Sequence, residues 1–447
     1  MAAATLSMLV PGLGQFILGA YRRALVLLGL TGAIVLASAA VVLAHPSLDA
    51  RLLVSILVLD LALLGLRVFA VVDAGRSTTP VFVAVLVVLT IAPHAAAGYL
   101  AVRSYTVLDR VFASEEPRDV LPSRGVFLSD APAPEPESER VPLGRPLVSS
   151  PELVTAAAPT ERPWTTILLL GTDEGPGNWG ARTDTIIVVA LEHGTRRAVA
   201  FGIPRNLVDL RVGGRLPVFH DLINALYSYA RAQPDLFPDS PDAGATALKL
   251  AVSRLLGVRI DYYALANLRG FADLVDALGG VTIDVKERLD DSVTRAAWGE
   301  PKPRIDVYPG RTYHFDGHHA LAYVRSRKDS DDYTRMARQR CFLSALADQV
   351  DPLRVLRNFE SLAHTVERNV RTDIPLNRLP GLVRLATAVD RRSTLTVTFG
   401  RDYIANRRKT DNFPRPNVPR IRATVREALL HPSDTSAGAI SVARESC

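Results

Sequence analysis

The chain has 447 residues, enough for two or more compact units, and its 48% hydrophobic and 22% charged residues exclude wholesale disorder. Its two cysteines, Cys341 and Cys447, exclude a disulfide-built scaffold and a Cys-rich zinc or iron–sulfur site. We expect Cys341 to be a packed thiol and not to form a disulfide with Cys447. The formal charge is 52 − 46 = +6, but no helix-turn-helix, zinc-finger or stacking-aromatic pattern accompanies it, so we expect no nucleic-acid partner.

The first part of the chain, 1–110, is predicted to be an all-α membrane anchor. Residues 24–44 carry no charge and are long enough to cross a bilayer as a helix, and we expect further spans over 52–72 and 80–102. Asp60 and Arg67 lie near one face of the second span, where we favour an interhelical or snorkelling pair. Residues 5–20 are apolar but short and broken by Gly and Pro, which favours an interfacial or re-entrant segment.

Charge and composition predict the topology. Arg22, Arg23 and Arg76 favour a cytoplasmic location for the ends that they flank, and three spans then place the later chain outside the cell. Arg51, Arg103 and Arg110 oppose this bias and a fourth span would invert the topology, so the composition of the following segment decides between the two. Residues 111–163 are rich in Pro, Glu and Ser, which predicts a disordered stalk. We therefore expect a multi-pass protein of the cell membrane with an extracytoplasmic domain over 164–432 and a tail over 433–447.

The extracytoplasmic region alternates strands with helices. Buried strands are predicted at TTILLLG (165–171) and TDTIIVVALE (183–192), and the second forms a hairpin with RRAVAFGIPR (196–205). Helical spacing follows over 245–256, 269–278 and 333–350, and strands over 260–267 and 281–285 lie between these helices. The fold class is therefore α/β, with a mixed sheet flanked by helices.

The loop after the first buried strand carries the first candidate site. It is rich in Gly and holds Asp173, Arg182 and Asp184, and α/β proteins place polar sites at such strand ends. Two carboxylates suit a hard cation such as Mg²⁺, which shares its coordination with phosphate oxygens and waters. The alternative is that both Asp residues are only turn and cap residues.

Arginine is the second signal, since 52 − 5 = 47 of the basic residues are Arg. The strand end GIPRN (202–206) delivers Arg205, and two more, Arg325 and Arg327, point to the same side of an extended segment. The following helix places Arg335, Arg338 and Gln339 on one side. So many cations would repel one another without an anion, and pyrophosphate fits them best.

These stretches together resemble the LytR-CpsA-Psr family of cell-wall glycopolymer transferases. The resemblance covers about 164–345, with weaker similarity to about 430, and it rests on the order of seven elements. They are LLLGTD (168–173), RTDT (182–185), IPR (203–205), INALY (223–227), FADLVDALGGV (271–281), FDGHHALAYVRSR (315–327) and RMARQR (335–340). The family's usual layout also has a membrane anchor and an external domain.

The resemblance implies a phosphotransferase that moves a glycopolymer from its polyprenyl-pyrophosphate carrier to peptidoglycan through a phosphodiester. It implies that Asp173 and Asp184 hold Mg²⁺ or Mn²⁺, with one of them as candidate base. The implied phosphate ligands are Arg182, Arg205, Arg325, Arg327, Arg335 and Gln339, to which the helix spacing adds Arg338. Asn224 of INALY is a candidate for polar support.

The sequence departs from the family pattern at two places. Asn206 replaces the acid that commonly follows Pro-Arg, which removes a charge but leaves a hydrogen-bonding group, and Leu222 replaces a frequent Lys. Two other functions stay open: a non-catalytic wall sensor or scaffold that binds polyprenyl pyrophosphate, and a hydrolase of that lipid. The Arg-, Ala- and Val-rich composition is associated with actinobacteria, but the sequence does not identify the polymer.

Overall fold

The structure is a computed structural model that describes residues 1–44, 50–113, 123–124, 126–128, 164–174, 181–291, 304–326, 328, 332–349, 351, 354, 357–389, 394–430 and 440–442. Most of the predicted stalk (111–163) and of the tail (433–447), together with Arg327, lies outside these residues. The chain divides into two compact units, one of Met1–Glu116 with Ile374–Arg384 and one of Pro117–Asp373 with Leu385–Cys447. Each unit is described by itself.

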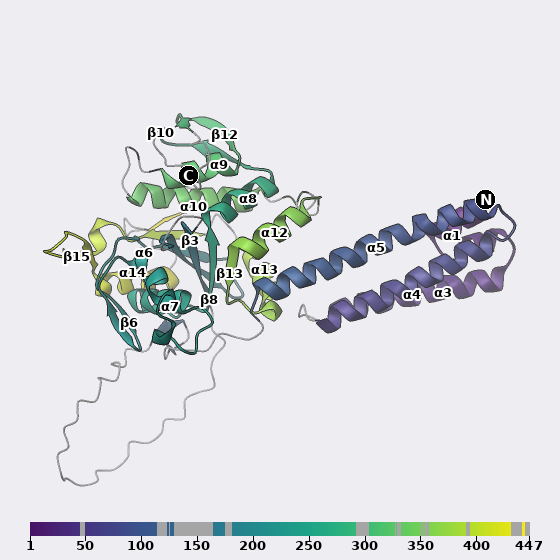
Figure 1. Ribbon diagram of the computed structural model, residues 1–447, viewed down its shortest axis with the longest axis horizontal. Helices are drawn as coiled ribbons and strands as arrows, with labels where there is room; N and C mark the ends of the chain where they lie inside the picture. The colour runs from purple at the N-terminus through teal and green to yellow at the C-terminus, as the bar shows by residue number, and fades with distance from the viewer. Residues whose placement is uncertain are drawn as a thin grey trace, which may run out of the picture. The chain divides into compact units, whose positions relative to one another are not determined.

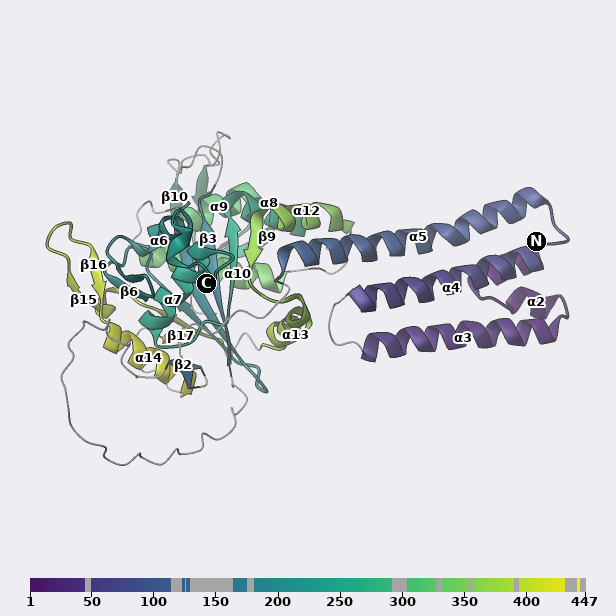
Figure 2. The same cartoon turned by 60° about the horizontal axis from the view of Figure 1, so that its bottom comes forward.

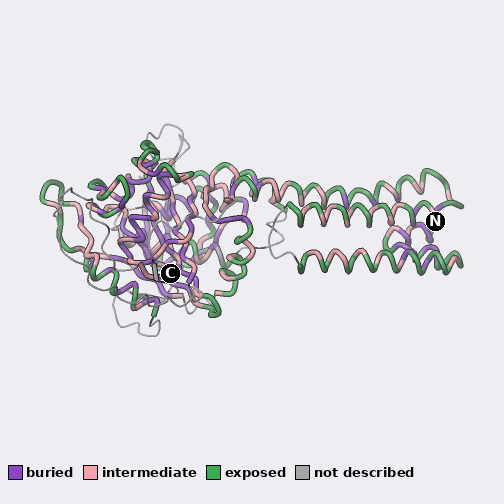
Figure 3. The backbone as a smooth tube through the Cα atoms, turned by 90° about the horizontal axis from the view of Figure 1, so that it is seen from below, coloured by how far each residue is buried: buried purple, intermediate pink, exposed green. Residues whose placement is uncertain are grey.

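Three long helices dominate the first unit: α3 (Tyr21–Ala44), α4 (Ala50–Ala74) and α5 (Pro80–Val111). All three are long and apolar enough to cross a membrane, as the sequence predicts. Few of their residues are buried, as Figure 3 shows, and in water so much exposed or half-exposed apolar surface would be unfavourable. The third helix continues past the predicted end at residue 102.

The N-terminal segment forms two short helices, α1 (Ala2–Leu9) and α2 (Leu13–Ile17), in agreement with a segment too short to span. Gly12 lies between them with φ 104°, and a Cβ there would be 2.7 Å from Ala24 O. Buried Gln15 ties α2 to α4, because its Nε2 donates to Ala70 O at 2.9 Å.

His94 links the two charged residues of the second span. Its Nδ1 lies 2.7 Å from Asp60 Oδ1, and Arg67 Nη1 lies 3.4 Å from its Nε2. Arg67 also donates to Leu9 O at 3.1 Å. The expected interhelical pairing is therefore made through His94 of α5, and the two charges satisfy polar groups inside the bundle.

The second unit is built on a seven-stranded mixed sheet with the order β13-β8-β3-β4-β5-β14-β17. The β3–β8 and β5–β14 pairs are parallel and the others antiparallel, which confirms the predicted mixed sheet. Its strands are β3 (Trp164–Thr172), β4 (Thr183–Glu192), β5 (Ala198–Gly202), β8 (Tyr262–Asn267), β13 (Val370–Thr372), β14 (Leu395–Thr398) and β17 (Ile440–Val442).

One face of this sheet is fully buried. Leu168, Val188, Phe201 and Val397 lie on it, in a core completed by α6 (Ile223–Arg231), α7 (Ala243–Leu256) and α14 (Val418–Leu430). Figure 2 shows α7 and α14 together beside the sheet. Strand alternation sends the neighbouring residues to the opposite face.

A second, smaller core lies at the end of the sheet that carries the site, in the upper part of the domain in Figure 1. Its elements are α8 (Leu268–Leu278), β9 (Val281–Val285), β10 (Leu289–Asp291), β11 (Ile305–Val307), β12 (Arg311–Phe315), α9 (Gly317–Arg325) and α10 (Asp332–Asp348). Cys341 of α10 is buried here and disulfide-bonded, so the prediction of a packed thiol is wrong; its partner lies outside the described residues.

Short elements complete the described chain. They are β1 (Ser123–Arg124), β2 (Phe127–Leu128), β6 (Leu210–Gly213), β7 (Leu216–Phe219), α12 (Phe359–Asn369), α13 (Leu379–Ala388), β15 (Ile404–Arg407), β16 (Pro414–Pro416) and the 3-10 turns Pro234–Leu236, Leu376–Arg378 and Arg401–Tyr403.

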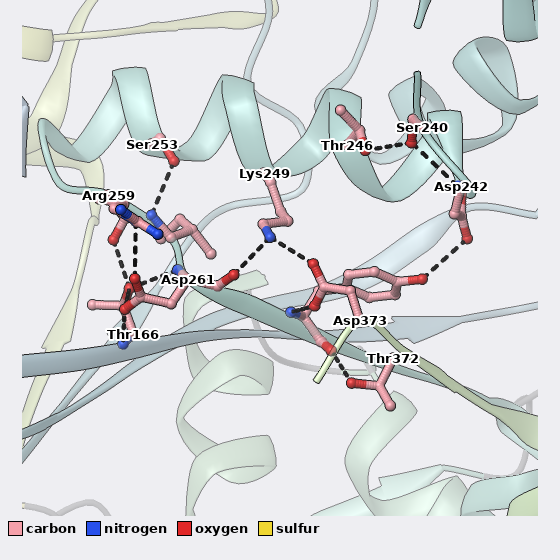
Figure 4. A network of polar contacts seen from close by, with 12 residues as sticks. Thr166, Ser240, Asp242, Thr246, Lys249, Ser253, Arg259, Asp261, Thr372 and Asp373 are labelled. Atoms are coloured by element: carbon pink, nitrogen blue, oxygen red, sulfur yellow. Dashed lines mark hydrogen bonds and ion pairs between the residues drawn. The ribbon is translucent and has the colours of Figure 1, made fainter. Parts of the chain in front are cut away.

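A polar network fastens α7 to the edge of the sheet (Figure 4). Lys249 Nζ donates to Asp261 O at 2.7 Å and pairs with Asp373 Oδ2 at 2.6 Å. Asp373 also accepts from Tyr263 N at 2.6 Å. Burial raises the pKa of Asp373, and Lys249 opposes that rise.

Replacing Lys249 by methionine should destabilise the protein by about 3 kcal/mol at neutral pH, because it leaves the Asp373 carboxylate buried without its cation. The folded-state pKa of Asp373 then rises further above its unfolded value. The loss is thus full above the folded-state pKa and disappears as the pH falls below about 4. Unfolding of the full-length protein at both pH values, beside exposed Lys409→Met, measures it; a loss that does not change with pH would contradict this role.

Candidate functional site

The pairing of β4 with β5 brings two predicted site residues opposite each other. In this antiparallel ladder Ile187 pairs with Gly202, and Ile203 N donates to Ile186 O at 3.0 Å. Continuing the same register places Asp184 opposite Arg205. Their side chains meet there, with Arg205 Nη1 2.5 Å from Asp184 Oδ1, and the Arg205 side chain is only 15% exposed.

Helix α6 adds Asn224 to this pair. Asn224 is buried, and its Nδ2 donates to Asp184 Oδ1 at 2.9 Å, while its backbone N donates to Arg205 O at 3.2 Å. The helix therefore fixes both members of the ion pair. Asn206 follows directly, and its Oδ1 is buried and accepts no hydrogen bond from the described residues, as is also the case for Asn224 Oδ1.

Asp173 lies just past β3, where its loop meets the start of β4. Arg182 N donates to Asp173 Oδ1 at 2.6 Å, and Asp173 N donates to Arg182 O at 3.1 Å. The Arg182 side chain is exposed, so its contact with Asp173 is made through the backbone. Burial is the main cause of a raised pKa at Asp173 and the charge of Asp184 adds to it, while the Arg182 N–H and Arg325 oppose it.

Arg325 is the last residue of α9, which belongs to the second core, and it lies close to the Asp and Arg residues described above. Burial lowers the pKa of Arg325, whereas Asp184 and Asp173 raise it and Arg205 lowers it. Each of these interactions requires proximity. Asp173, Asp184, Arg205 and Arg325 thus form one charged cluster at the strand ends, and we call these four residues the strand-end cluster.

Helix α10 carries the remaining predicted ligands. Arg335 and Gln339 are buried, and Gln339 Nε2 donates to Val324 O at 3.3 Å, next to Arg325. Arg338 turns toward the other side of α9: its Nη2 donates to Ser326 O and its guanidinium lies 5.9 Å from the Tyr323 ring centre. The structure therefore gives Arg338 contacts within the protein, and its predicted role toward phosphate stays a prediction.

Two groups near the cluster are not singled out by sequence patterns. Glu174, which follows Asp173, pairs with Arg231 of α6 at 2.9 Å and with Arg371 of β13 at 3.5 Å. Arg340 of α10 is largely shielded from solvent, and burial lowers its pKa to about 10. The partners of Glu174 and the residue that Arg340 packs against, Gly202, lie far away in sequence, so only the fold reveals these arrangements.

The second face of the central sheet is apolar but incompletely covered. Strand register places one row of residues from four strands on it, and their side chains are small or aliphatic and partly exposed. We call these residues the open sheet face: Ile167, Leu169, Val189, Ala200, Ala264 and Ala266. The strand-end cluster lies at one end of the strands that form this face.

The mixed sheet flanked by helices and the charged cluster at its strand ends are the features expected of the family that the sequence resembles. Comparison with known families gives the same assignment. The chain belongs to the LytR_cpsA_psr family, whose model matches residues 149–412. The family assignment predicted from the sequence is therefore confirmed.

Individual relatives are more distant. The chain is 28% identical over 263 residues to the polyisoprenyl-teichoic acid–peptidoglycan teichoic acid transferase TagV of Bacillus subtilis, which covers 58% of this chain and 62% of TagV. It is 30% identical over 205 residues to the cell wall biosynthesis protein LcpA of Corynebacterium glutamicum, covering 43% of this chain and 38% of LcpA. The match thus spans less than two thirds of either relative.

The chain was also compared with solved structures. The LytR-CPS2A-psr family protein YwtF (TagT) with bound octaprenyl pyrophosphate lipid is 22% identical, with a TM-score of 0.40, and the match covers 60% of this chain and 91% of that chain.

Proposed function

We propose that this protein is a membrane-anchored extracytoplasmic phosphotransferase that moves a glycopolymer from a polyprenyl-pyrophosphate carrier onto peptidoglycan. The observation that carries the proposal is the strand-end cluster, in which two Arg and two Asp residues converge beside an apolar sheet face. A pyrophosphate matches the cations, and a prenyl chain matches the open sheet face. The names of the transferases to which the chain is similar agree with this activity.

The anchor and Cys341 support the location. Three helices of spanning length favour a multi-pass protein, and a disulfide at Cys341 is favoured in the oxidising space outside the cytoplasm. Membrane attachment would hold the domain beside the lipid carrier, which stays in the bilayer.

The site residues fit a divalent cation such as Mg²⁺. Asp173 and Asp184 would hold it, and no group of three or more His, Cys or acidic residues suited to a metal is found among the described residues. The other ligands would be phosphate oxygens and waters, as Mg²⁺ prefers. The buried Oδ1 atoms of Asn206 and Asn224 accept no hydrogen bond from the described residues and are further hard oxygen acceptors next to Arg205 and Asp184. When bound, Mg²⁺ would neutralise charge on the phosphates.

The protein's own residues supply position and charge. Arg205 and Arg325 would hold the pyrophosphate in line with an acceptor hydroxyl, and their charges oppose the negative charge that grows on the bridging oxygen. One carboxylate of the cluster would accept the proton of the acceptor hydroxyl; the raised pKa of Asp173 makes it the better candidate. Such a mechanism requires no covalent intermediate with the protein.

The full-length protein in detergent tests the proposal. It is given a synthetic polyprenyl-pyrophosphate oligosaccharide, peptidoglycan fragments and Mg²⁺. We expect polyprenyl phosphate to be released only when peptidoglycan fragments are present, together with oligosaccharide linked to them. Release at the same rate without fragments would show a hydrolase instead, and tight binding without release would show a sensor.

A separate prediction concerns binding of the prenyl chain to the open sheet face. Ala200→Phe fills part of the space above β5 and should weaken binding of geranylgeranyl pyrophosphate about tenfold, near 1.4 kcal/mol, while leaving inorganic pyrophosphate unaffected. Exposed Ala405→Phe is the matched control. Equal loss for both ligands, or for neither, would contradict the assignment of the prenyl chain to this face.

A further inference from the structure

Arg340 is a mostly but not fully buried cation, and it has no counter-charge among the described residues. Its Nε and Nη1 atoms are shielded from solvent and donate no hydrogen bond, and burial is the only cause of its lowered pKa, about 10. The side chain therefore remains charged at neutral pH. A buried and unpaired charge is unfavourable, and proteins retain such groups mainly where a ligand completes them.

The guanidinium lies against the sheet, beside the open sheet face. A Cβ placed on Gly202 would be 2.9 Å from Arg340 Nη1 and 3.0 Å from Met336 Cε, so any larger residue there would have to displace the ends of these two side chains. Gly202 pairs with Ile187 of β4 and with Thr398 of β14, two residues along β5 from Ala200 of the open sheet face. Alternation along β5 places residues 200 and 202 on the same face.

The polar residues of α10 leave the helix in two different directions. At roughly 100° per residue, Gln339 lies within about 40° of Arg335, and Arg340 lies about 140° from it, next to Met336. Gln339 faces α9, where its Nε2 donates to Val324 O, and Arg335 lies on the same side of the helix, whereas Met336 and Arg340 face the sheet at Gly202. Gly202 precedes Arg205 by three residues, about 10 Å of extended chain, so Arg340 lies between the cluster and the open sheet face.

We propose that Arg340 binds the lipid-side phosphate of the carrier, the one that leaves with the prenyl chain. This inference rests on the proposed function. In the transfer, the acceptor oxygen bonds to the sugar-side phosphorus and the bond from that phosphorus to the bridging oxygen breaks. The electron pair goes to the lipid-side phosphate, and the acceptor proton goes to a carboxylate of the cluster. Arg340 stabilises the charge gained by the lipid-side phosphate.

Two measurements on the full-length protein in detergent, ligand affinity and unfolding temperature, distinguish phosphate binding by Arg340 from a role in packing alone. Arg340→Met should weaken binding of geranylgeranyl phosphate by about tenfold or more and leave geranylgeraniol within about twofold, since a charge-assisted contact is lost. Without ligand, the variant should unfold at the same or a higher temperature, because an unpaired buried charge is removed. Arg340→Lys keeps the charge and should retain part of the binding. Arg368→Met, at an exposed site of α12, is the matched control.

Gly202→Ala provides an independent test, because its methyl group would displace the Arg340 guanidinium. We expect it to weaken geranylgeranyl phosphate binding in the wild type but to have no effect in the Arg340→Met background. Additive effects, or unchanged phosphate binding in a folded Arg340→Met variant, would overturn the role of Arg340. Failure of the proposed function is distinguishable: the wild type itself would then bind geranylgeranyl pyrophosphate no more tightly than geranylgeraniol.

Discussion

Arg205→Met should lower the rate of glycopolymer transfer about 100- to 1,000-fold. The guanidinium lies 2.5 Å from Asp184 at the strand end, and its side chain is only 15% exposed. A charge held in such a shielded place opposes the growing charge of the transition state without reorganisation, and removal of one such donor typically costs about 3–4 kcal/mol. Arg205→Lys should recover only part of the rate, because an ammonium lacks the planar pair of donors.

The fold should survive this change. Asp184 keeps its hydrogen bond from Asn224 Nδ2 at 2.9 Å, so the carboxylate is not left without a donor. The measurement is kcat/KM for acceptor-dependent release of polyprenyl phosphate, with the thermal unfolding temperature recorded beside it. Arg368→Met, exposed on α12, serves as the control for loss of one positive charge. A folded Arg205→Met protein with more than a tenth of the wild-type rate would exclude Arg205 from the phosphate site.

Asp184→Asn should be at least as damaging, with a loss of about 1,000-fold or more. Asparagine keeps the shape of the side chain and an oxygen that can face Arg205, so the substitution removes mainly the negative charge. That charge is one of two available to hold the cation, and cation stabilisation of phosphate charge contributes several kcal/mol. Each 1.4 kcal/mol corresponds to about a tenfold change in rate.

Metal binding gives this prediction a second readout. Mn²⁺ titration followed by electron paramagnetic resonance should show one site in the wild type and a much weaker one in Asp184→Asn. Asp239→Asn, at an exposed position, is the matched control for loss of a carboxylate. A variant that binds Mn²⁺ as the wild type does would move the cation away from Asp184.

Local sequence patterns predict the frame of the site well. The hairpin over 183–205 follows from two strands joined by a short turn, and its antiparallel register, continued beyond the paired residues, places Asp184 opposite Arg205. The mixed sheet and the three long apolar helices likewise follow from period and length. These features depend on neighbours in the chain, where sequence patterns are most informative.

Features that depend on packing between distant segments could not be predicted in this way. Helical spacing groups Arg338 with Arg335 and Gln339, but it does not predict that Arg338 Nη2 donates to Ser326 O. The fold also brings Arg340 against Gly202, some 140 residues earlier in the chain, and no spacing rule links the two. That Arg340 has no acidic partner among the described residues can be recognised only from the three-dimensional structure.

The proposed reaction transfers a phosphate together with the sugar, and not the sugar alone. A carrier labelled with ³²P in its sugar-side phosphate, incubated with full-length protein, peptidoglycan fragments and Mg²⁺, tests it directly. We predict that the label appears in the peptidoglycan fragments, in equal amount to unlabelled polyprenyl phosphate, and that Arg205→Met abolishes both. Label that stays with the lipid, or that appears in free sugar phosphate, would contradict phosphotransfer to peptidoglycan.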